Sequence, residues 1–220
     1  MPLSIGRRWW NTLFKKSPAP VLLVVEGAHD ATFLKHVSRI LSLHDPDLPN
    51  LGDWEADGRC LFLPVGGGDA AGWTDRLAFL RLAEFHLYDR ELPPTSELRR
   101  ARVERLNRHP RRRAFETCKR ALENYLHPQA VGEALGIELT IHDDTAVAEM
   151  TARAIHDRDH PERPWDSLPY RSAKRRRERA KRLLNTQAVE RMTAELLAKR
   201  DPQGEIAGWL ETIAALAAIG

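Results

Sequence analysis

The chain has 220 residues, 42% hydrophobic and 30% charged, with a net charge of +3 at pH 7. This composition is typical of a globular protein with a sizeable core and excludes a disordered tail or a collagen. The longest apolar runs, Val21–Val25 and residues 214–220, fall far short of the roughly 18 apolar residues that span a bilayer. Two distant cysteines give no disulfide framework or zinc motif, and the Arg7-Arg8-Trp9-Trp10 start lacks a secretory signal. We therefore expect a cytoplasmic protein without membrane association.

Basic residues are concentrated in two segments. Residues 99–120 carry ten Lys and Arg side chains against two acidic ones, and residues 171–182 carry eight against one. Arginine outnumbers lysine, and guanidinium groups pair well with phosphate, so we expect both segments to bind nucleic acid. Two solvated helix faces are the alternative. The residues expected to contact nucleic acid are Arg111, Arg112, Arg113, Lys119, Arg120, Lys174, Arg175 and Arg176.

Three short apolar runs, each followed by a helical pattern, indicate three βα units. The runs are Val21–Val25, Cys60–Val65 and Phe85–Tyr88. Continuous runs of this length are typical of strands buried in a parallel sheet. The first helix is expected to have Asp30 as its N-cap, the second surrounds Trp73, and the third covers Ser96–Asn107. We predict an α/β fold with a parallel sheet flanked by helices and a helical C-terminal extension.

The second half of the chain is less regular. Residues 111–126 fit either a helix or a fourth strand followed by a short helix. Two amphipathic stripes, Val189 to Leu197 and Ile206 to Leu216, predict helices that complete the core, and residues 157–170 form a loop between them and the body. The expected organisation is a basic leader over 1–19, a catalytic domain over 20–135 and a mainly helical extension over 136–220 on the same core.

The predicted strand ends carry the residues that are suited to catalysis or metal binding. Glu26 follows the first strand, and Asp89 and Glu91 follow the third. Ligands of parallel sheets bind at the carboxyl ends of strands, and side chains two apart on extended backbone point the same way. Three carboxylates in one pocket repel each other unless a cation neutralises them, and carboxylate oxygens suit Mg²⁺ or Mn²⁺. The alternative is that Asp89 and Glu91 only cap the next helix.

Glycines follow two of these strands. Gly27 is expected to allow a tight turn after Glu26, and Gly66 and Gly67 to turn the chain after the second strand. The backbone N–H groups of Gly66-Gly67-Gly68 are also suited to cradle a phosphate, although the dinucleotide fingerprint is absent. His29 and His86 lie near the predicted site, either as proton carriers or as ordinary hydrogen-bonded residues.

Two of these strand ends resemble motifs of the TOPRIM fold. Val24-Val25-Glu26-Gly27-Ala28-His29-Asp30 is similar to the first motif, a glutamate and a glycine after a hydrophobic strand. Tyr88-Asp89-Arg90-Glu91 resembles the second, with Glu91 where aspartate is usual. Lys119-Arg120-Ala121-Leu122-Glu123-Asn124-Tyr125-Leu126 is similar to a segment of OLD (overcoming lysogenization defect) nucleases, and Lys181-Arg182-Leu183-Leu184 is a weaker match downstream. The chain thus resembles an OLD-type TOPRIM protein over about residues 20–135.

This resemblance implies a metal-dependent endonuclease that hydrolyses nucleic-acid phosphodiesters, DNA before RNA, with Mg²⁺ or Mn²⁺. It makes Glu26 a metal ligand or general base, Asp89 and Glu91 metal ligands, and Glu123 a ligand of a second metal. Lys181 would stabilise negative charge on the phosphate. Without the resemblance, Glu123 would simply pair with Lys119 one helical turn away.

The resemblance also implies partners and a setting. No Gly-x-x-x-x-Gly-Lys-Ser/Thr pattern is present, so any ATPase is expected to be a separate chain. A role in anti-phage defence or a mobile element follows from the resemblance, and a homodimer is a further expectation. The alternative function is a non-catalytic TOPRIM module that binds nucleic acid or a partner, because Glu91 departs from the motif. A phosphotransfer domain is disfavoured, because it needs aspartate where this chain has Glu26.

Overall fold

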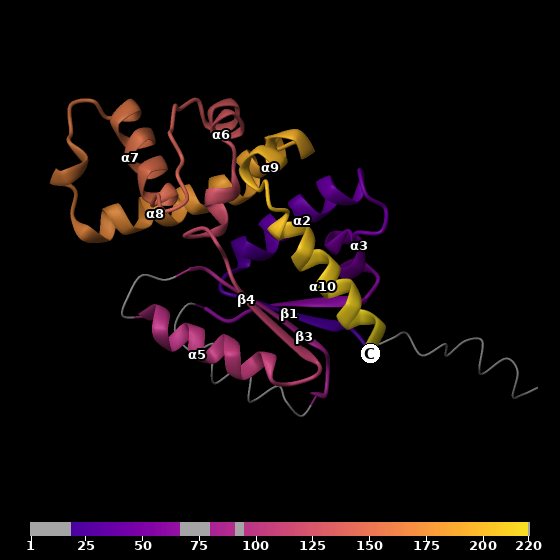
Figure 1. Cartoon of the computed structure of the whole chain (residues 1–220). Coiled ribbons are helices and arrows are strands. Elements are labelled where there is room, and N and C mark those ends of the chain that lie inside the picture. Colours follow the sequence, from indigo (N-terminus) through magenta and orange to yellow (C-terminus); the bar gives the residue numbers. More distant parts are fainter. Residues whose placement is uncertain (1–18, 67–79, 91–94, 220) are drawn as a thin grey trace, which may run out of the picture.

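The computed structural model describes residues 19–66, 80–90 and 95–219 (Figure 1). The expected leader lies outside these ranges apart from Ala19. Also outside them are Glu91, Gly67, Gly68 and the helical pattern around Trp73. Among the described residues, no helix combines the length and apolar character needed to cross a membrane.

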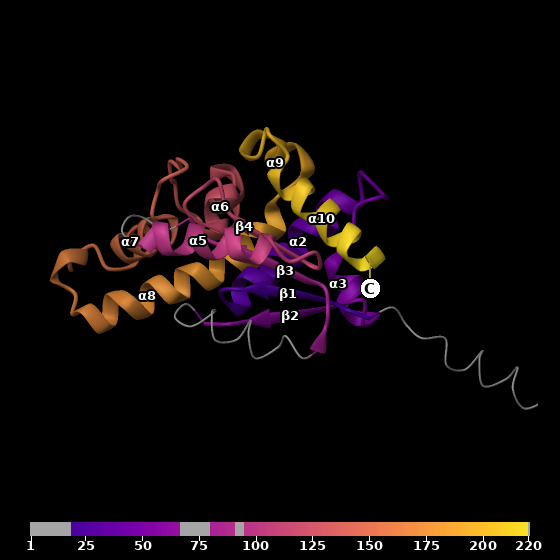
Figure 2. The same ribbon diagram turned by 60° about the horizontal axis from the view of Figure 1, so that its bottom comes forward.

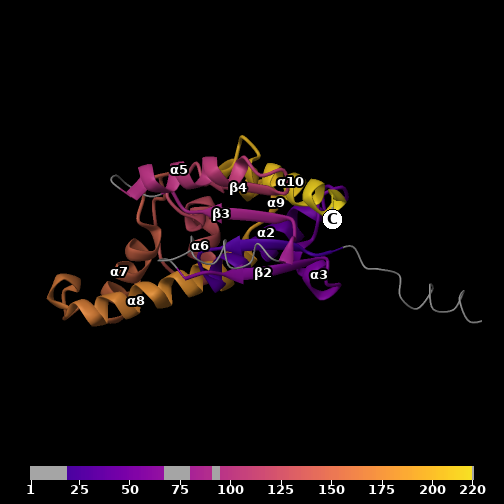
Figure 3. The same ribbon diagram turned by 90° about the horizontal axis from the view of Figure 1, so that it is seen from below.

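Within the described ranges, four parallel strands form a central sheet. They are β1 (Val21–Val25), β2 (Cys60–Pro64), β3 (Glu84–Tyr88) and β4 (Arg112–Glu116). Their order is β2-β1-β3-β4, and all four strands are labelled in Figure 2; Figure 3 shows the sheet from below. The predicted α/β class with a parallel sheet and flanking helices is therefore confirmed. Residues 111–126 fit either a helix or a strand by sequence. The second alternative, a strand followed by a short helical turn, is correct, because β4 completes the sheet beside β3.

Helices cover both faces of the sheet. They are α2 (Ala28–Ser42), α3 (Leu51–Ala56), α5 (Thr95–Asn107) and α10 (Glu205–Ile219). Because side chains alternate along a strand, the odd-numbered residues of β1 join the large apolar cluster that includes α2 and α10. Leu22 and Val24 join a smaller cluster with Leu106 of α5. Figure 1 shows α5 on one side of the sheet and α2 and α10 on the other.

The chain between β4 and α10 is mainly helical. Its segments are η2 (Leu122–Tyr125), α6 (Pro128–Leu135), α7 (Val147–Asp159), η3 (Trp165–Ser167), α8 (Tyr170–Leu183), η4 (Leu184–Ala188), η5 (Val189–Arg191) and α9 (Ala194–Arg200). The turns η2, η3 and η5 are 3₁₀ helical, and η4 is a π-helical turn. Helices α7 and α8 pack together around Ala152, Trp165 and Ala180 as a hairpin that extends away from the sheet (Figures 1 and 2).

Two expectations for the C-terminal region are wrong in detail. The apolar residues from Val189 to Leu197 are buried, but they do not share one helix, because the chain leaves helical geometry at Met192. Helix α9 restarts at Thr193, whose Oγ1 accepts a hydrogen bond from the Leu196 backbone N–H at 3.2 Å. The proline-containing segment 157–170 links α7 to α8, rather than linking the last helices to the body. The stripe along α10 is buried against the sheet as predicted.

The start of α2 also differs from expectation. Its N-cap is Gly27, and Asp30 is the third residue of the helix, where its Oδ2 accepts a hydrogen bond from the Gly27 N–H at 2.8 Å. Gly27 has φ −141°, an extended geometry open to any residue, so the turn does not require glycine. Gly66 has φ +61° and does occupy the left-handed region that favours glycine.

Candidate active site

The neighbouring strands β1 and β3 bring Glu26 and Asp89 to the same edge of the sheet. Glu26 Oε1 accepts a hydrogen bond from the Asp89 backbone N–H at 3.2 Å. Arg99 of α5 forms an ion pair with Glu26, and its Nη1 also donates to the Asp89 carbonyl oxygen at 2.5 Å. The basic helix α5 therefore contributes a cation directly to the acidic edge.

A second cation, Lys181 of α8, lies among three carboxylates. Its Nζ is 3.2 Å from Asp30 Oδ1, 3.6 Å from Glu123 Oε1 and 3.9 Å from Asp89 Oδ2. These carboxylates come from α2, η2 and the end of β3, so residues far apart in sequence meet at one point. We call Glu26, Asp30, Asp89, Glu123 and Lys181 the carboxylate cluster.

Burial and like charge shift the proton affinities of this cluster. Desolvation raises the pKa of Asp89 well above its usual range, and Glu123, Asp30 and Glu26 raise it further while Lys181 opposes them. Desolvation also raises the pKa of Glu26, with Arg99 acting in the opposite direction. For Lys181, burial lowers the pKa, but the attraction of its three carboxylate neighbours outweighs it and the pKa is raised. Lys181 is therefore protonated at neutral pH.

Asn185 holds the Glu123 side chain, and the backbone of the preceding residue ties the same turn to Asp89. The Asn185 Nδ2 donates to Glu123 Oε1 at 2.8 Å, and the Leu122 backbone N–H donates to Asp89 Oδ1 at 3.3 Å. Lys181 and Asn185 are four residues apart, across the junction where α8 becomes the π-helical turn η4, and such turns occur often at functional sites. The alternative pairing of Glu123 with Lys119 is wrong: η2 is a 3₁₀ turn, and Lys119 pairs with Asp143.

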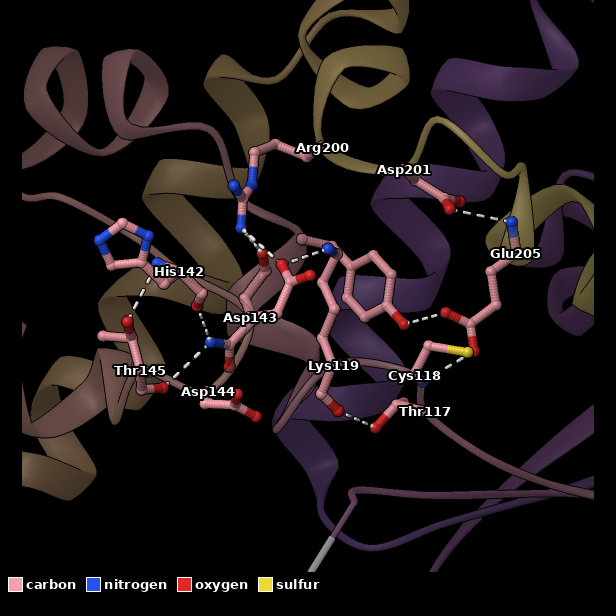
Figure 4. Close-up of polar contacts among 12 residues, drawn as sticks. Thr117, Cys118, Lys119, His142, Asp143, Asp144, Thr145, Arg200, Asp201 and Glu205 are labelled. Carbon is pink, nitrogen blue, oxygen red and sulfur yellow. Dashed lines mark hydrogen bonds and ion pairs between the residues drawn. The ribbon is translucent and has the colours of Figure 1, made fainter.

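The residues after Glu123 lock this turn to the rest of the fold (Figure 4). The Asn124 Nδ2 donates to the His142 and Thr145 carbonyl oxygens at 2.8 and 3.0 Å. Tyr125 donates its hydroxyl proton to Glu205 at the start of α10 and packs edge-on against Trp209, with ring centroids 5.7 Å apart.

Arg200 adds a connection from α9, since its Nη2 donates to the Asn124 carbonyl oxygen at 2.6 Å and lies 3.6 Å from Asp143 Oδ1 (Figure 4). Each residue of the Glu123-Asn124-Tyr125 string thus has a separate contact that fixes η2. The C-terminal helices therefore hold in place a turn that carries one member of the carboxylate cluster.

A buried polar chain runs along β3 beneath α5. Arg112 Nη2 lies 3.0 Å from Glu84 Oε1, Glu84 Oε2 lies 2.8 Å from His86 Nε2, and His86 Nδ1 lies 3.1 Å from the Tyr88 hydroxyl. Burial lowers the pKa of His86 and raises that of Tyr88 to about 12. His86 is thus a neutral, hydrogen-bonded core residue, rather than a proton carrier. The Arg99 guanidinium lies over the Tyr88 ring, 5.5 Å from its centroid, so this chain supports the cation that pairs with Glu26.

The donor set of the cluster suits a hard divalent cation in charge and in atom type. Among the described residues, the four carboxylates pair with two cations, Lys181 and Arg99. Burial is the main cause of the raised pKa of Asp89, and the neighbouring carboxylates raise it further. Within the described ranges, which exclude Glu91, no three His, Cys, Asp or Glu side chains are arranged to hold a metal ion as they stand. Metal binding at this edge would therefore require carboxylates to exchange partners with Lys181 or Arg99.

The predicted nucleic-acid contacts fall into two groups. Lys174 and Arg175 are exposed on α8, and Arg176 is partly exposed there. The other five are partly buried and lie on or near β4. Among them, Arg112 pairs with buried Glu84 and Lys119 pairs with exposed Asp143, so both side chains already have carboxylate partners.

Sequence reasoning missed three residues of the site. The sequence pattern indicates Asp30 only as a helix cap and Arg99 only as part of a basic segment, and it does not single out Asn185. The position of Asp30, one helical turn after Glu26, is the available clue, because carboxylates in the first turn of a helix face the same edge as the preceding strand end.

Comparison with known proteins finds no matching protein-family model, no curated relative and no similar solved structure. The functional conclusion therefore depends on the chemistry of the residues at this edge.

Proposed function

We propose that the protein is a metal-dependent nuclease of the TOPRIM type, similar to OLD nucleases, that hydrolyses phosphodiester bonds, preferentially in DNA. The observation that carries the proposal is the convergence of four carboxylates and Lys181 at the carboxyl edge of a parallel sheet. This edge receives one cation from each of the two basic helices, Arg99 from α5 and Lys181 from α8. A polyanion attracted by those helices would thus be guided to the acidic centre.

The resemblance to OLD nucleases and the surroundings of each residue together give it a role in this proposal. Mg²⁺ or Mn²⁺, when bound, polarises the phosphate and lowers the pKa of a water molecule. Glu26 and Asp89 would hold it, Glu123 would support a second ion, and Glu91 lies outside the described residues. The raised pKa of Glu26 also makes it a stronger base near neutral pH than an exposed carboxylate. Protonated Lys181 would stabilise negative charge on the phosphate.

The direct test is hydrolysis by the purified full-length protein. Supercoiled plasmid, linear duplex, single-stranded DNA and RNA are incubated with Mg²⁺, with Mn²⁺ or with EDTA. We expect metal-dependent cleavage of DNA, and a loss of at least about a hundredfold in Glu26→Gln and Asp89→Asn, because both remove a charge at the reacting centre.

Glu133→Gln is the matched control. Glu133 is exposed on α6, where it only accepts a hydrogen bond from Gln129, so this change should leave the rate within about twofold. A folded wild-type protein that cleaves none of the four substrates with either metal would exclude nuclease function.

A second candidate function is a TOPRIM-like module that binds nucleic acid or a partner without cleavage. It is favoured by the ion pairs in which Arg99 engages Glu26 and Lys181 engages both Asp30 and Glu123, because these pairs occupy carboxylates that a metal would need. Under this hypothesis, calorimetry should detect DNA binding that is unchanged by Glu26→Gln, with no Mn²⁺ binding in the wild type. Metal binding that Asp89→Ala abolishes would instead support the nuclease.

A further inference from the structure

A cavity of about 240 Å³ lies beside the carboxylate cluster, between η2, the start of α7 and α8. Asp89, Glu123 and Lys181 line it, so it is continuous with the cluster. Its lining also includes Arg120 and Arg177, which the proposed chemistry does not use. The volume is below the roughly 300–1,000 Å³ of pockets that enclose a whole cofactor, and it suits a single charged group.

Within the described part of the chain, each of these arginine side chains makes one hydrogen bond, and the Arg177 guanidinium also lies over the Tyr170 ring, 5.8 Å from its centroid. The Arg120 Nη1 donates to the Asp144 carbonyl oxygen at 3.1 Å, and the Arg177 Nη1 lies 3.4 Å from Glu149 Oε2. A guanidinium carries five N–H donors in a fork that matches phosphate oxygens. Each of these contacts uses one nitrogen, and the contact with exposed Glu149 is long.

The first turn of α7 adds positive potential to the same cavity. Its N-cap, Ala146, and its first residues, Val147 and Ala148, line the cavity. Ala146 supplies no side-chain hydrogen bond to this 13-residue helix, whose Val147 and Glu149 N–H groups donate to the backbone carbonyl oxygens of Thr145 and Ala146. Those groups carry the positive end of the helix dipole, which favours an anion.

We propose that this cavity binds a phosphate group of the nucleic-acid strand, next to the phosphate at the carboxylate cluster, with Arg177 and Arg120 as its ligands. The assignment to a substrate strand rests on the proposed function. It gives the polyanion a second fixed point beside the cluster, because Lys181 and Asp89 belong to both sites. In the bound state, the phosphate replaces Glu149 as the partner of Arg177.

The test is calorimetric titration of the full-length protein in EDTA, which prevents metal-dependent cleavage. The probes are 5′-phosphorylated dithymidine dinucleotide, thymidine 5′-monophosphate and inorganic phosphate. We expect Arg177→Gln to weaken dinucleotide binding about tenfold, as for loss of a charge-assisted hydrogen bond. Glu149→Gln should strengthen binding severalfold, because it removes the carboxylate that competes for Arg177, and such a gain cannot come from misfolding.

Arg171→Gln is the control of equal charge change, since Arg171 is exposed on the same helix and does not line the cavity. The proposal is overturned if Arg177→Gln and Arg171→Gln have equal effects, if the dinucleotide does not bind, or if inorganic phosphate binds as tightly as the dinucleotide. Cleavage activity is measured separately. If the protein cleaves DNA but Arg177→Gln leaves dinucleotide binding unchanged, the phosphate site is contradicted and the proposed function stands. If dinucleotide binding depends on Arg177 but the protein cleaves no substrate, the proposed function is contradicted and the phosphate site stands.

Discussion

Lys181 Nζ lies 3.2 Å from Asp30 Oδ1, which joins α8 to the first turn of α2. Asp30 is buried, with 3% of its surface exposed. Water therefore cannot solvate its carboxylate in place of the Lys181 ammonium. Because Lys181 also faces Glu123 and Asp89, one side chain compensates charges from three segments of the fold. The α7–α8 hairpin is therefore tied to the sheet through the same residue that we place in the active site.

Lys181→Met should destabilise the protein strongly. The change leaves buried carboxylates without their cation, and breaking one partner of a buried ion pair costs roughly 3–5 kcal/mol. Urea unfolding followed by circular dichroism measures this loss. Lys174→Met, on an exposed position of the same helix, should stay within about 0.5 kcal/mol. Equal effects of the two changes would show that Lys181 does not carry this charge compensation.

Asp89→Asn should stabilise the protein at neutral pH while abolishing hydrolysis. The pKa of Asp89 is raised on folding, so the folded state binds the proton more tightly and the contribution of Asp89 to stability falls as pH rises above about 4. Removing this charge should add about 1 kcal/mol at pH 7.5 and little at pH 4. Urea unfolding of both proteins at the two pH values gives the comparison, with exposed Asp157→Asn as control. A gain that is independent of pH would contradict the assignment.

Divalent metal should raise the melting temperature of the wild type. A ligand that binds only the folded state adds about 2.7 kcal/mol at a hundred times its dissociation constant. Differential scanning fluorimetry with Mn²⁺, Mg²⁺ and EDTA tests this, and Asp89→Asn should show no metal-dependent shift. Equal shifts in both proteins would place the metal elsewhere.

Tyr125→Phe should weaken both stability and catalysis. The change removes the hydrogen bond to Glu205 and leaves that carboxylate with one donor fewer, at a cost of roughly 1.5–3 kcal/mol. Because Tyr125 follows Glu123 by two residues, the turn that positions Glu123 should loosen and the cleavage rate should fall severalfold. Tyr170→Phe, at a side chain 73% exposed, should alter neither property. Full activity in a destabilised Tyr125→Phe would show that the turn does not position Glu123.

His86 should make the protein less stable in mild acid. Its pKa is lowered on folding, so the unfolded chain takes up a proton first as pH falls below about 6.5, and stability is lost down to the folded pKa. Each proton contributes at most about 1.4 kcal/mol per pH unit. His86→Gln should reduce the slope of the unfolding free energy between pH 6.5 and 5. The pKa values of His36 and His127 are also lowered, but they affect both proteins alike. An unchanged slope would contradict the burial of a neutral His86.

Local patterns in the sequence determined strands β1, β2 and β3 and the acidic residues that follow β1 and β3. The apolar runs before Glu26 and Asp89 predicted β1 and β3, because burial on both faces of a parallel sheet requires continuous apolar residues. Parallel strands end at the same edge, so their carboxylates could be placed together without further information. The apolar stripe of α10 also predicted its helix, because the spacing of apolar residues along one face follows from helix geometry alone.

Tertiary packing decided the remainder. The segment that became β4 carries both helical and strand periodicity, and only the open edge beside β3 selected the strand. Arg112 looked like a phosphate ligand, whereas the fold pairs it with Glu84, a buried charge that needs a partner. Lys181 and Asn185 reach Glu123 because η4, which continues α8, packs against α2 and α6, a long-range arrangement that no local period encodes. Short-range sequence patterns therefore determine which helices and strands form. Which charged residues from distant segments come into contact depends on how those helices and strands pack.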